Sequence, residues 1–235
     1  MKQVTTALTS FDAALDRGDS ATYAHCQRTA GMAVVLGRRL GLTHDQLLTL
    51  ERGVFLHDIG KIHIPERLLK KSGLLEEAEW KVMRGHAVTG YAMLSSNSAL
   101  TEVAAIVLAH HERYDGTGYP HRLEGDDIPF GAKICAVVDC FDMLTAADHS
   151  YRRAMSVAEA WIYIRSQQGR HFDPVVVEAF LSITPAQWRQ FHVAFSAPHQ
   201  RRLDWSTIRQ PFMDDLNAAP FDNISAKVVA CLGAS

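Results

Sequence analysis

The sequence predicts an all-α protein, a bundle of helices around one buried core. Apolar residues recur at three- and four-residue spacings through most of the 235 residues, which is the spacing of one face of a helix. No convincing run of alternating apolar and polar residues indicates a strand. Capping residues, glycines and prolines separate the apolar stretches and mark where helices begin and end.

The expected helices follow from these signals in chain order. The first covers Lys2–Asp16, and the second begins at Asp19 or Ser20 and stops at Gly41. Capping boxes open further helices, and prolines or glycines close them. The remaining expected helices are 44–60, which starts at the Thr43/Gln46 box, then 76–95, 100–112 and 131–147, one from the Ser156/Glu159 box, 174–181, and one from Thr184.

The expected organisation is one main domain with additions at both ends. Residues 1–19 form an N-terminal helix that packs on the domain, residues 20–183 form the domain, and residues 184–235 form an aromatic-rich helical extension. Within the domain, residues 113–130 contain too many glycines and prolines for regular structure, so a long loop is expected there.

Composition limits the possible partners and location. Hydrophobic residues make up 47% of the chain and charged residues 21%, as in ordinary globular proteins. A net charge of −2 gives no broad basic surface for nucleic acid or a membrane. No secretion signal and no apolar stretch of ~18 residues is evident, so we expect a cytoplasmic protein. The four cysteines lack C-x-x-C spacing and are expected to be buried, reduced thiols.

One stretch places chemistry in the expected core. His57, Asp58 and Lys61 lie at the end of an apolar run that would cover most of a helix's circumference, so this helix should be interior. A buried histidine and aspartate must be paired, hydrogen-bonded or bound to a metal. Adjacent residues point about 100° apart on a helix, so both can reach one site over its end.

Other residues could complete a metal site. A single histidine is most simply a hydrogen-bonded core or surface residue, but a doublet at a helix end beside a glycine-rich loop favours metal binding. His and Asp ligands together suit iron, manganese or zinc. The further candidates are His25, His86, His110, His111 and Asp139.

Two segments together resemble the HD-GYP family, a branch of the HD phosphohydrolase superfamily. They are His57-Asp58-Ile59-Gly60-Lys61 and residues 110–120, which read HHERYDGTGYP. His86 and the segment Val138–Asp142 add to the resemblance, which covers about residues 20–183. It implies an HD-domain helical bundle with a long GYP-containing loop, and a bacterial enzyme that degrades cyclic di-GMP.

The resemblance also implies roles for individual residues. His25, His57, Asp58 and Asp139 would hold one metal ion, and Asp58 would bridge to a second ion held by His86, His110 and His111. Lys61 would approach the scissile phosphate or the metal-bound water, Tyr119 would belong to a lid and partner-contact loop, and Asp142 would be a supporting carboxylate. The ions would be iron or manganese, with zinc, nickel and magnesium left open.

Two departures from the family pattern affect these expectations. Members with three metals have a glutamate where this chain has Ala21, so two metals are expected. The family's Asp-Arg-Pro-Tyr-Arg segment reads Asp148-His149-Ser150-Tyr151-Arg152 here. His149 cannot form the bidentate hydrogen bonds of an arginine to phosphate or guanine, so substrate affinity or preference would change. Arg152 keeps a positive charge on this side of the site.

The expected activity is a two-metal phosphodiesterase in which metal-bound hydroxide hydrolyses cyclic di-GMP to pGpG, with a second cut to GMP if the linear product rebinds. Lys61 and Asp58 would be its catalytic residues. One alternative is a phosphodiesterase for another cyclic dinucleotide or for pGpG. Another is a non-catalytic module that binds nucleotide or a diguanylate cyclase through the GYP loop. A homodimer is also possible, and an all-α structural protein is the least specific alternative.

Overall fold

The computed structural model describes residues 20–71, 73–146 and 154–195. Within these ranges every regular element is a helix, so the all-α fold class is confirmed. The expected N-terminal helix lies outside the described residues, as does the expected extension beyond residue 195. No helix in the described ranges combines the length and apolar character that crossing a membrane requires.

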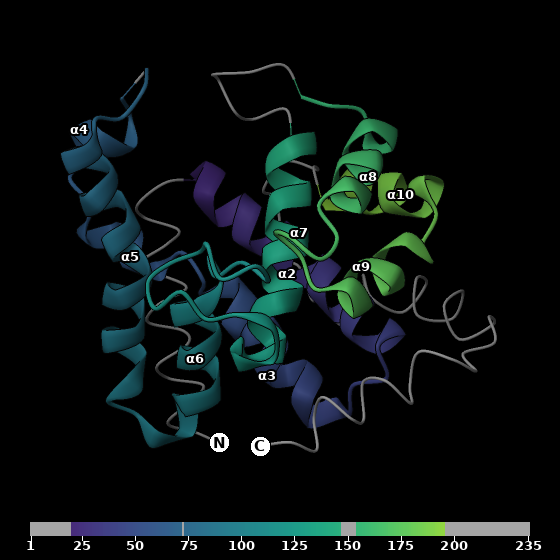
Figure 1. Cartoon of the computed structure of the whole chain (residues 1–235), viewed down its shortest axis with the longest axis horizontal. Coiled ribbons are helices and arrows are strands. Elements are labelled where there is room, and N and C mark those ends of the chain that lie inside the picture. The colour runs from purple at the N-terminus through teal and green to yellow at the C-terminus, as the bar shows by residue number, and fades with distance from the viewer. Residues whose placement is uncertain (1–19, 72, 147–153, 196–235) are drawn as a thin grey trace.

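The helices form a bundle with α2 and α7 in its middle, the pair α5 and α6 on one side and α8, α9 and α10 on the other (Figure 1). Their bounds, in chain order, are α2 (Ser20–Arg39), α3 (His44–Phe55), the 3₁₀ helix η1 (Ile59–His63), α4 (Glu66–Leu69), α5 (Glu77–Ser95), η2 (Ser98–Leu100), α6 (Thr101–Ala109), η3 (Gly125–Asp127), α7 (Phe130–Thr145), α8 (Val157–Ser166), α9 (Pro174–Leu181) and α10 (Pro185–Phe195).

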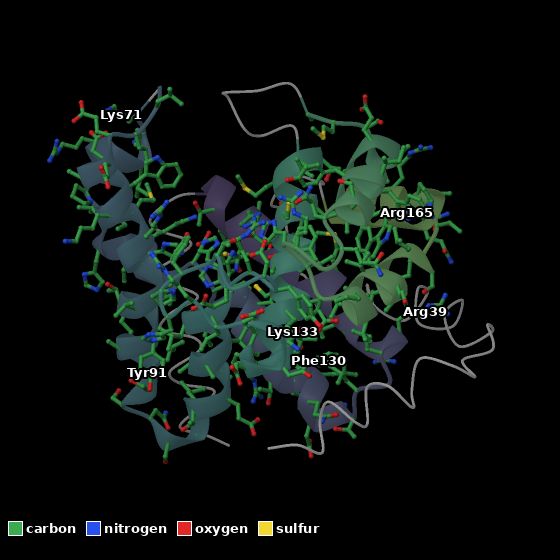
Figure 2. All side chains as sticks on the ribbon, in the orientation of Figure 1. Arg39, Lys71, Tyr91, Phe130, Lys133 and Arg165 are labelled. Carbon is green, nitrogen blue, oxygen red and sulfur yellow. The ribbon has the colours of Figure 1, made fainter. Side chains whose placement is uncertain are left out.

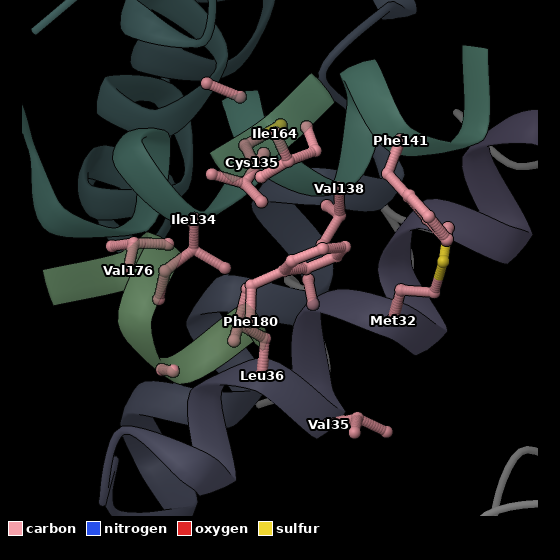
Figure 3. Close-up of a cluster of buried hydrophobic side chains, with 14 of the residues drawn as sticks. Met32, Val35, Leu36, Ile134, Cys135, Val138, Phe141, Ile164, Val176 and Phe180 are labelled. Carbon is pink, nitrogen blue, oxygen red and sulfur yellow. The ribbon is translucent and has the colours of Figure 1, made fainter. Parts of the chain in front are cut away.

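The main core lies where α2 and α7 meet the C-terminal helices. Met32 and Leu36 of α2 pack with Val138 and Phe141 of α7 and with Phe180 of α9 (Figure 3). All five side chains are removed from water, which supplies most of the driving force for holding these helices together. The core therefore fixes α2 against α7, the two helices that carry His25 and Asp139.

The C-terminal helix α10 closes one side of this core. Trp188 is fully buried, and its ring stacks on Phe180 with centroids 4.8 Å apart. Its indole N–H donates to the carbonyl of Phe180, as a buried tryptophan requires. Trp188 thus packs α10 against the main core.

A buried ion pair fastens α7 to the start of α9. Lys133, which Figure 2 labels in the middle of the molecule, donates to Asp173 over 3.1 Å, and both side chains are 4% exposed. Lys133 also donates to Asp126 of η3 over 3.0 Å. An unpaired charge would be costly at this depth, so Lys133 needs its acidic partners. Its bond to Asp126 also ties the loop before α7 to the core.

The capping residues confirm several expected helix starts, but the chain around the expected site differs from a continuous helix. Helix α3 ends at Phe55, not at Gly60, and the 3₁₀ helix η1 follows. The reason is a change of hydrogen bonding. Leu56 N still donates four residues back to Arg52, whereas His57 N donates three residues back to Val54, which tightens the chain into a turn. His57 and Asp58 therefore project from a turn between two helices.

Gly60 allows η1 to pack directly on α5. A Cβ at residue 60 would overlap the carbonyl oxygen of His86 and lie 2.7 Å from the backbone nitrogen of Gly90. Both neighbours are backbone atoms of one helix and cannot rotate away. The close approach therefore fixes the distance between the turn carrying Asp58 and the helix carrying His86.

We expect Gly60→Ala to lower the free energy of unfolding by about 1–3 kcal/mol, because backbone must move to admit the methyl group. Urea unfolding followed by circular dichroism measures the change. The matched control is Gly85→Ala, since a Cβ there meets nothing within 4 Å. That substitution should raise stability by roughly 0.5–1 kcal/mol, and equal effects of the two variants would contradict the packing argument.

Candidate metal centre

Five separate segments bring the seven expected metal ligands to one place in the bundle. His25 comes from α2, His57 and Asp58 from the turn after α3, and His86 from α5. The doublet His110-His111 directly follows α6, and Asp139 comes from α7. Five of the seven residues are buried, and Asp139, whose side chain is 15% exposed, and His111 are partly buried.

The first group consists of His25, His57 and Asp58, each of which offers one ligand atom within 4.8 Å of the others. Asp139 adjoins this group, because its Oδ1 lies 3.1 Å from Nε2 of His25 and 3.9 Å from Nε2 of His57. Two imidazoles and two carboxylates thus surround one point.

The second group consists of His86, His110 and His111, whose ligand atoms also lie within 4.8 Å of one another. The rings of His57 and His110 stand 5.0 Å apart, so the two groups are neighbours.

Asp58 lies between the two groups and contacts both. Its Oδ2 is 3.5 Å from Nε2 of His57, and its Oδ1 is 3.4 Å from Nε2 of His86. One oxygen therefore faces each group, which is the arrangement of a carboxylate that bridges two cations.

Backbone carbonyls fix the tautomer of three of the histidines. Nδ1 of His57 donates to Val54, Nδ1 of His86 to Met83 and Nδ1 of His110 to Val107, at 2.6–2.7 Å in each case. In a neutral ring the other nitrogen, Nε2, then carries a lone pair and no proton.

The lone pairs of these rings face one another, and this tests whether the residues fit a metal. Nε2 of His86 and Nε2 of His110 are 3.1 Å apart, too close for two acceptors unless a cation lies between them. Burial lowers the pKa of both rings, so neither is expected to hold an extra proton at neutral pH. The donor set therefore fits a metal ion.

Charge is arranged so that Asp58 stays ionised. Burial opposes its ionisation, but the charge of Lys61 and the nearby histidines outweigh burial and hold the pKa of the Asp58 carboxyl well below its usual range. Lys61 Nζ donates to Oδ2 of Asp58 over 2.6 Å, and the lysine side chain remains 31% exposed. Lys61 thus reaches from the solvent-facing edge to the carboxylate of Asp58.

The carboxylate of Asp142, which forms a buried ion pair with Arg28, orients His25. Nδ1 of His25 donates to Asp142 over 2.8 Å, and Arg28 donates to both oxygens of the same carboxylate at 2.8 and 2.9 Å. Burial lowers the pKa of His25, but the bonds to Asp139 and Asp142 outweigh it and raise the pKa to about 10. Binding of a cation between His25 and Asp139 would therefore release a proton.

The GYP-containing loop closes over the second group. The ring of Tyr119 stacks on His111 with centroids 4.8 Å apart. The buried carboxylate of Glu112 accepts the backbone N–H groups of His121 and Leu123, at 2.7 and 3.2 Å. Gly118 packs so tightly that a Cβ would lie 2.6 Å from Cα of Glu112, so loop geometry accounts for that glycine.

Other expected substrate-binding residues are not placed. His149 and Arg152 lie outside the described residues, so their roles stay predictions. Conversely, the structure adds Arg28 and Glu112, which sequence reasoning did not single out. Arg28 follows His25 by three residues on α2, and this spacing was the signal available for it.

A model of the HD domain family matches residues 11–176 of this chain. The chain belongs to the HD domain family. Curated relatives also support its resemblance to the HD-GYP branch. One is the cyclic di-GMP phosphodiesterase response regulator RpfG of Xanthomonas campestris, 42% identical over 170 residues, which are 72% of this chain and 45% of the relative. Another is a cyclic di-GMP phosphodiesterase of Thermotoga maritima, 37% identical over 70% of this chain and 45% of the relative.

Relatives with a different named substrate also match. The 3′3′-cGAMP-specific phosphodiesterase 2 of Vibrio cholerae is 38% identical over 72% of this chain and 32% of its own length. The chain thus spans less than half the length of these three curated relatives.

Solved structures show the same fold. The structure of the V. cholerae cyclic GMP-AMP phosphodiesterase V-cGAP3 matches 97% of this chain and 57% of its own, with a TM-score of 0.58 and 19% identity. Bd1817, an HDG"Y"P protein from Bdellovibrio bacteriovorus, matches 69% of this chain and 52% of its own, with a TM-score of 0.55 and 20% identity.

We expect Asp142→Asn to weaken metal binding by about 10–100-fold, because His25 loses the carboxylate that orients it. Chelator competition with elemental analysis measures this. Arg28→Gln is the matched variant, since it removes the ion pair but leaves Asp142 to accept from His25. It should lower stability while changing metal affinity only a few-fold. Metal affinity unchanged in Asp142→Asn would contradict the orienting role.

We expect Glu112→Gln to loosen the GYP-containing loop, because an amide offers one acceptor oxygen where the carboxylate offers two. The backbone N–H groups of His121 and Leu123 both donate to that carboxylate. Leaving one of them without an acceptor lowers the stability of the loop by about 1–3 kcal/mol. Hydrogen exchange at His121 and Leu123 should accelerate by about tenfold or more, while exchange in α7 stays unchanged. Unaltered protection at both amides would show that Glu112 does not hold the loop.

Proposed function

We propose that this chain is a metal-dependent phosphodiesterase that hydrolyses cyclic di-GMP to linear pGpG, with further cleavage to GMP where the linear product rebinds. The observation that carries the proposal is the position of Asp58, with one carboxylate oxygen toward each group of histidines. Two cations bound on either side of that carboxylate would suit cleavage of a phosphodiester better than a single structural ion would.

The proposed ligand sets divide around Asp58. His25, His57, Asp58 and Asp139 would hold the first ion, and Asp58, His86, His110 and His111 would hold the second. Imidazole and carboxylate ligands without thiolate favour iron or manganese, and zinc, nickel or magnesium would also fit. With Ala21 where three-metal members have a glutamate, we propose two ions.

When bound, a pair of divalent cations makes a nucleophile available from water near neutral pH and neutralises charge on the phosphate oxygens. The chain's own residues do the positioning. Asp58 stays ionised and would be shared by both ions, and the carbonyl-bound rings of His57, His86 and His110 keep their lone pairs directed inward. In the balanced reaction, water adds to phosphorus, the bond from phosphorus to the 3′ oxygen breaks, and that oxygen leaves with a proton.

Lys61 is the proposed protein cation at the reacting phosphate. Its ammonium is already directed at the bridging carboxylate and remains partly exposed. A substrate phosphate near Asp58 would therefore meet a positive charge that offsets the negative charge developing on its non-bridging oxygens. Tyr119, His149 and Arg152 are the other proposed substrate contacts.

A related substrate is the second candidate. A relative 38% identical to this chain is named as specific for 3′3′-cGAMP, and His149 replaces an arginine of the family's pattern. Comparing kcat/KM for cyclic di-GMP, 3′3′-cGAMP and pGpG separates these activities. Binding of a diguanylate cyclase through the GYP-containing loop, a homodimer and a cytoplasmic location remain predictions, as does a purely binding role.

The test begins with protein prepared with and without oxygen, analysed for metals, and supplied with cyclic di-GMP. About two ions per chain and formation of pGpG, identified by mass spectrometry, are the expected results. Metal-loaded protein that hydrolyses no cyclic or linear dinucleotide would refute the activity and favour a non-catalytic module that binds nucleotide or protein.

We expect Asp58→Ala to abolish metal retention and to reduce turnover by more than about 10³-fold. The reason is that each proposed ion loses a ligand. Loss of a single oxyanion donor in an enzyme typically reduces turnover by up to about 10³-fold. The control is Asp45→Ala, which removes an exposed carboxylate from the first turn of α3. Near-normal hydrolysis by Asp58→Ala protein of known metal content would refute the two-ion site.

A further inference from the structure

The guanidinium of Arg84 lies against Tyr119, the loop tyrosine that stacks on His111. The guanidinium carbon of Arg84 is 5.4 Å from the ring centroid of Tyr119 and 5.7 Å from that of Trp80. Trp80 and Arg84 are four residues apart on α5, so they share one face of that helix. Because Tyr119 stacks on His111, the side chains form a continuous row from Trp80 to the second group of ligands.

Arg84 is held in place by rings and not by an acid. In the described parts of the chain, no carboxylate lies within ion-pair distance of Arg84 and no hydrogen bond occupies its N–H groups. Arg84 is exposed, and so is Trp80, at 44%. A planar fork of N–H donors is therefore oriented by aromatic contacts while its edge remains available to a ligand.

We propose that Arg84 binds a guanine base of the substrate at its O6 and N7 atoms, with Trp80 and Tyr119 as the aromatic surface beside it. This assignment rests on the proposed function and names how that site would recognise its substrate. In the proposed function the scissile phosphate lies near Lys61 and the two groups of ligand residues. A base of the same nucleotide that extends toward the GYP-containing loop would then pass Tyr119.

The chemistry of the row matches a purine better than a second phosphate. A phosphate needs cations but no aromatic surface, whereas nucleobases stack on aromatic rings and on guanidinium planes. Guanine presents two adjacent acceptors, O6 and N7, which match a bidentate arginine. Adenine presents an N6 donor in place of O6, which would oppose an arginine N–H.

The test compares KM and kcat for cyclic di-GMP and cyclic di-AMP in three variants. Arg84→Met removes the fork, Arg84→Lys keeps a cation over the two rings without the fork, and Lys81→Met removes a charge from the same helix. For cyclic di-GMP, Arg84→Met should raise KM by about tenfold or more with little change in kcat. Its KM for cyclic di-AMP should stay near that of the unmodified protein.

The other two variants separate recognition from support of the loop. Arg84→Lys should lose the preference for guanine although it still contacts Tyr119, and Lys81→Met should match the unmodified protein. Calorimetric titration of metal-depleted protein with cyclic di-GMP gives a readout that does not require turnover. There the Kd should rise by about tenfold in Arg84→Met.

Each contrary result has a distinct meaning. An equal rise in KM for both dinucleotides would show a phosphate contact and overturn the assignment to guanine. Arg84 variants that behave like Lys81→Met would overturn it while leaving the proposed function intact. Unmodified protein that neither binds nor hydrolyses either dinucleotide would overturn the proposed function and, with it, this assignment.

Discussion

The candidate metal centre depends on buried imidazole nitrogens that face one another as acceptors. His86 and His110 approach to 3.1 Å through nitrogens that carry lone pairs, since the opposite nitrogen of each ring is bound to a backbone carbonyl. Such a contact is repulsive without a cation. The core of α2 and α7 and the packing of η1 on α5 place these rings where a cation would bind.

The same local device appears three times at the site. His57, His86 and His110 each donate from Nδ1 to the carbonyl three residues earlier. For His57 and His110 that carbonyl lies in the last turn of a helix, and the Val54 carbonyl also accepts the backbone N–H of His57. The bond fixes the tautomer of all three rings, two of which stand where a helix ends.

Residue type and helical spacing were sufficient to predict the all-α class, most helix boundaries and the ligand candidates. The turn at His57 was not predictable from apolar spacing, because side-chain and backbone bonds to Val54 end the helix there. The pairing of Arg28 with Asp142 joins residues 114 positions apart, and such a partner has no local signal. The row formed by Arg84 and Tyr119 likewise depends on where the loop folds back.

The two groups of ligands differ in how far apart their members lie along the chain. Residues 57–111 supply the whole second group together with Asp58, whereas His25 and Asp139 come from α2 and α7, which the main core and the Arg28–Asp142 ion pair hold together. A local separation of α2 from α7 would dismantle the first group and leave three histidines assembled. If each group holds one ion, as proposed, the two ions would then exchange with solution at unequal rates, and the protein would pass through a singly loaded form.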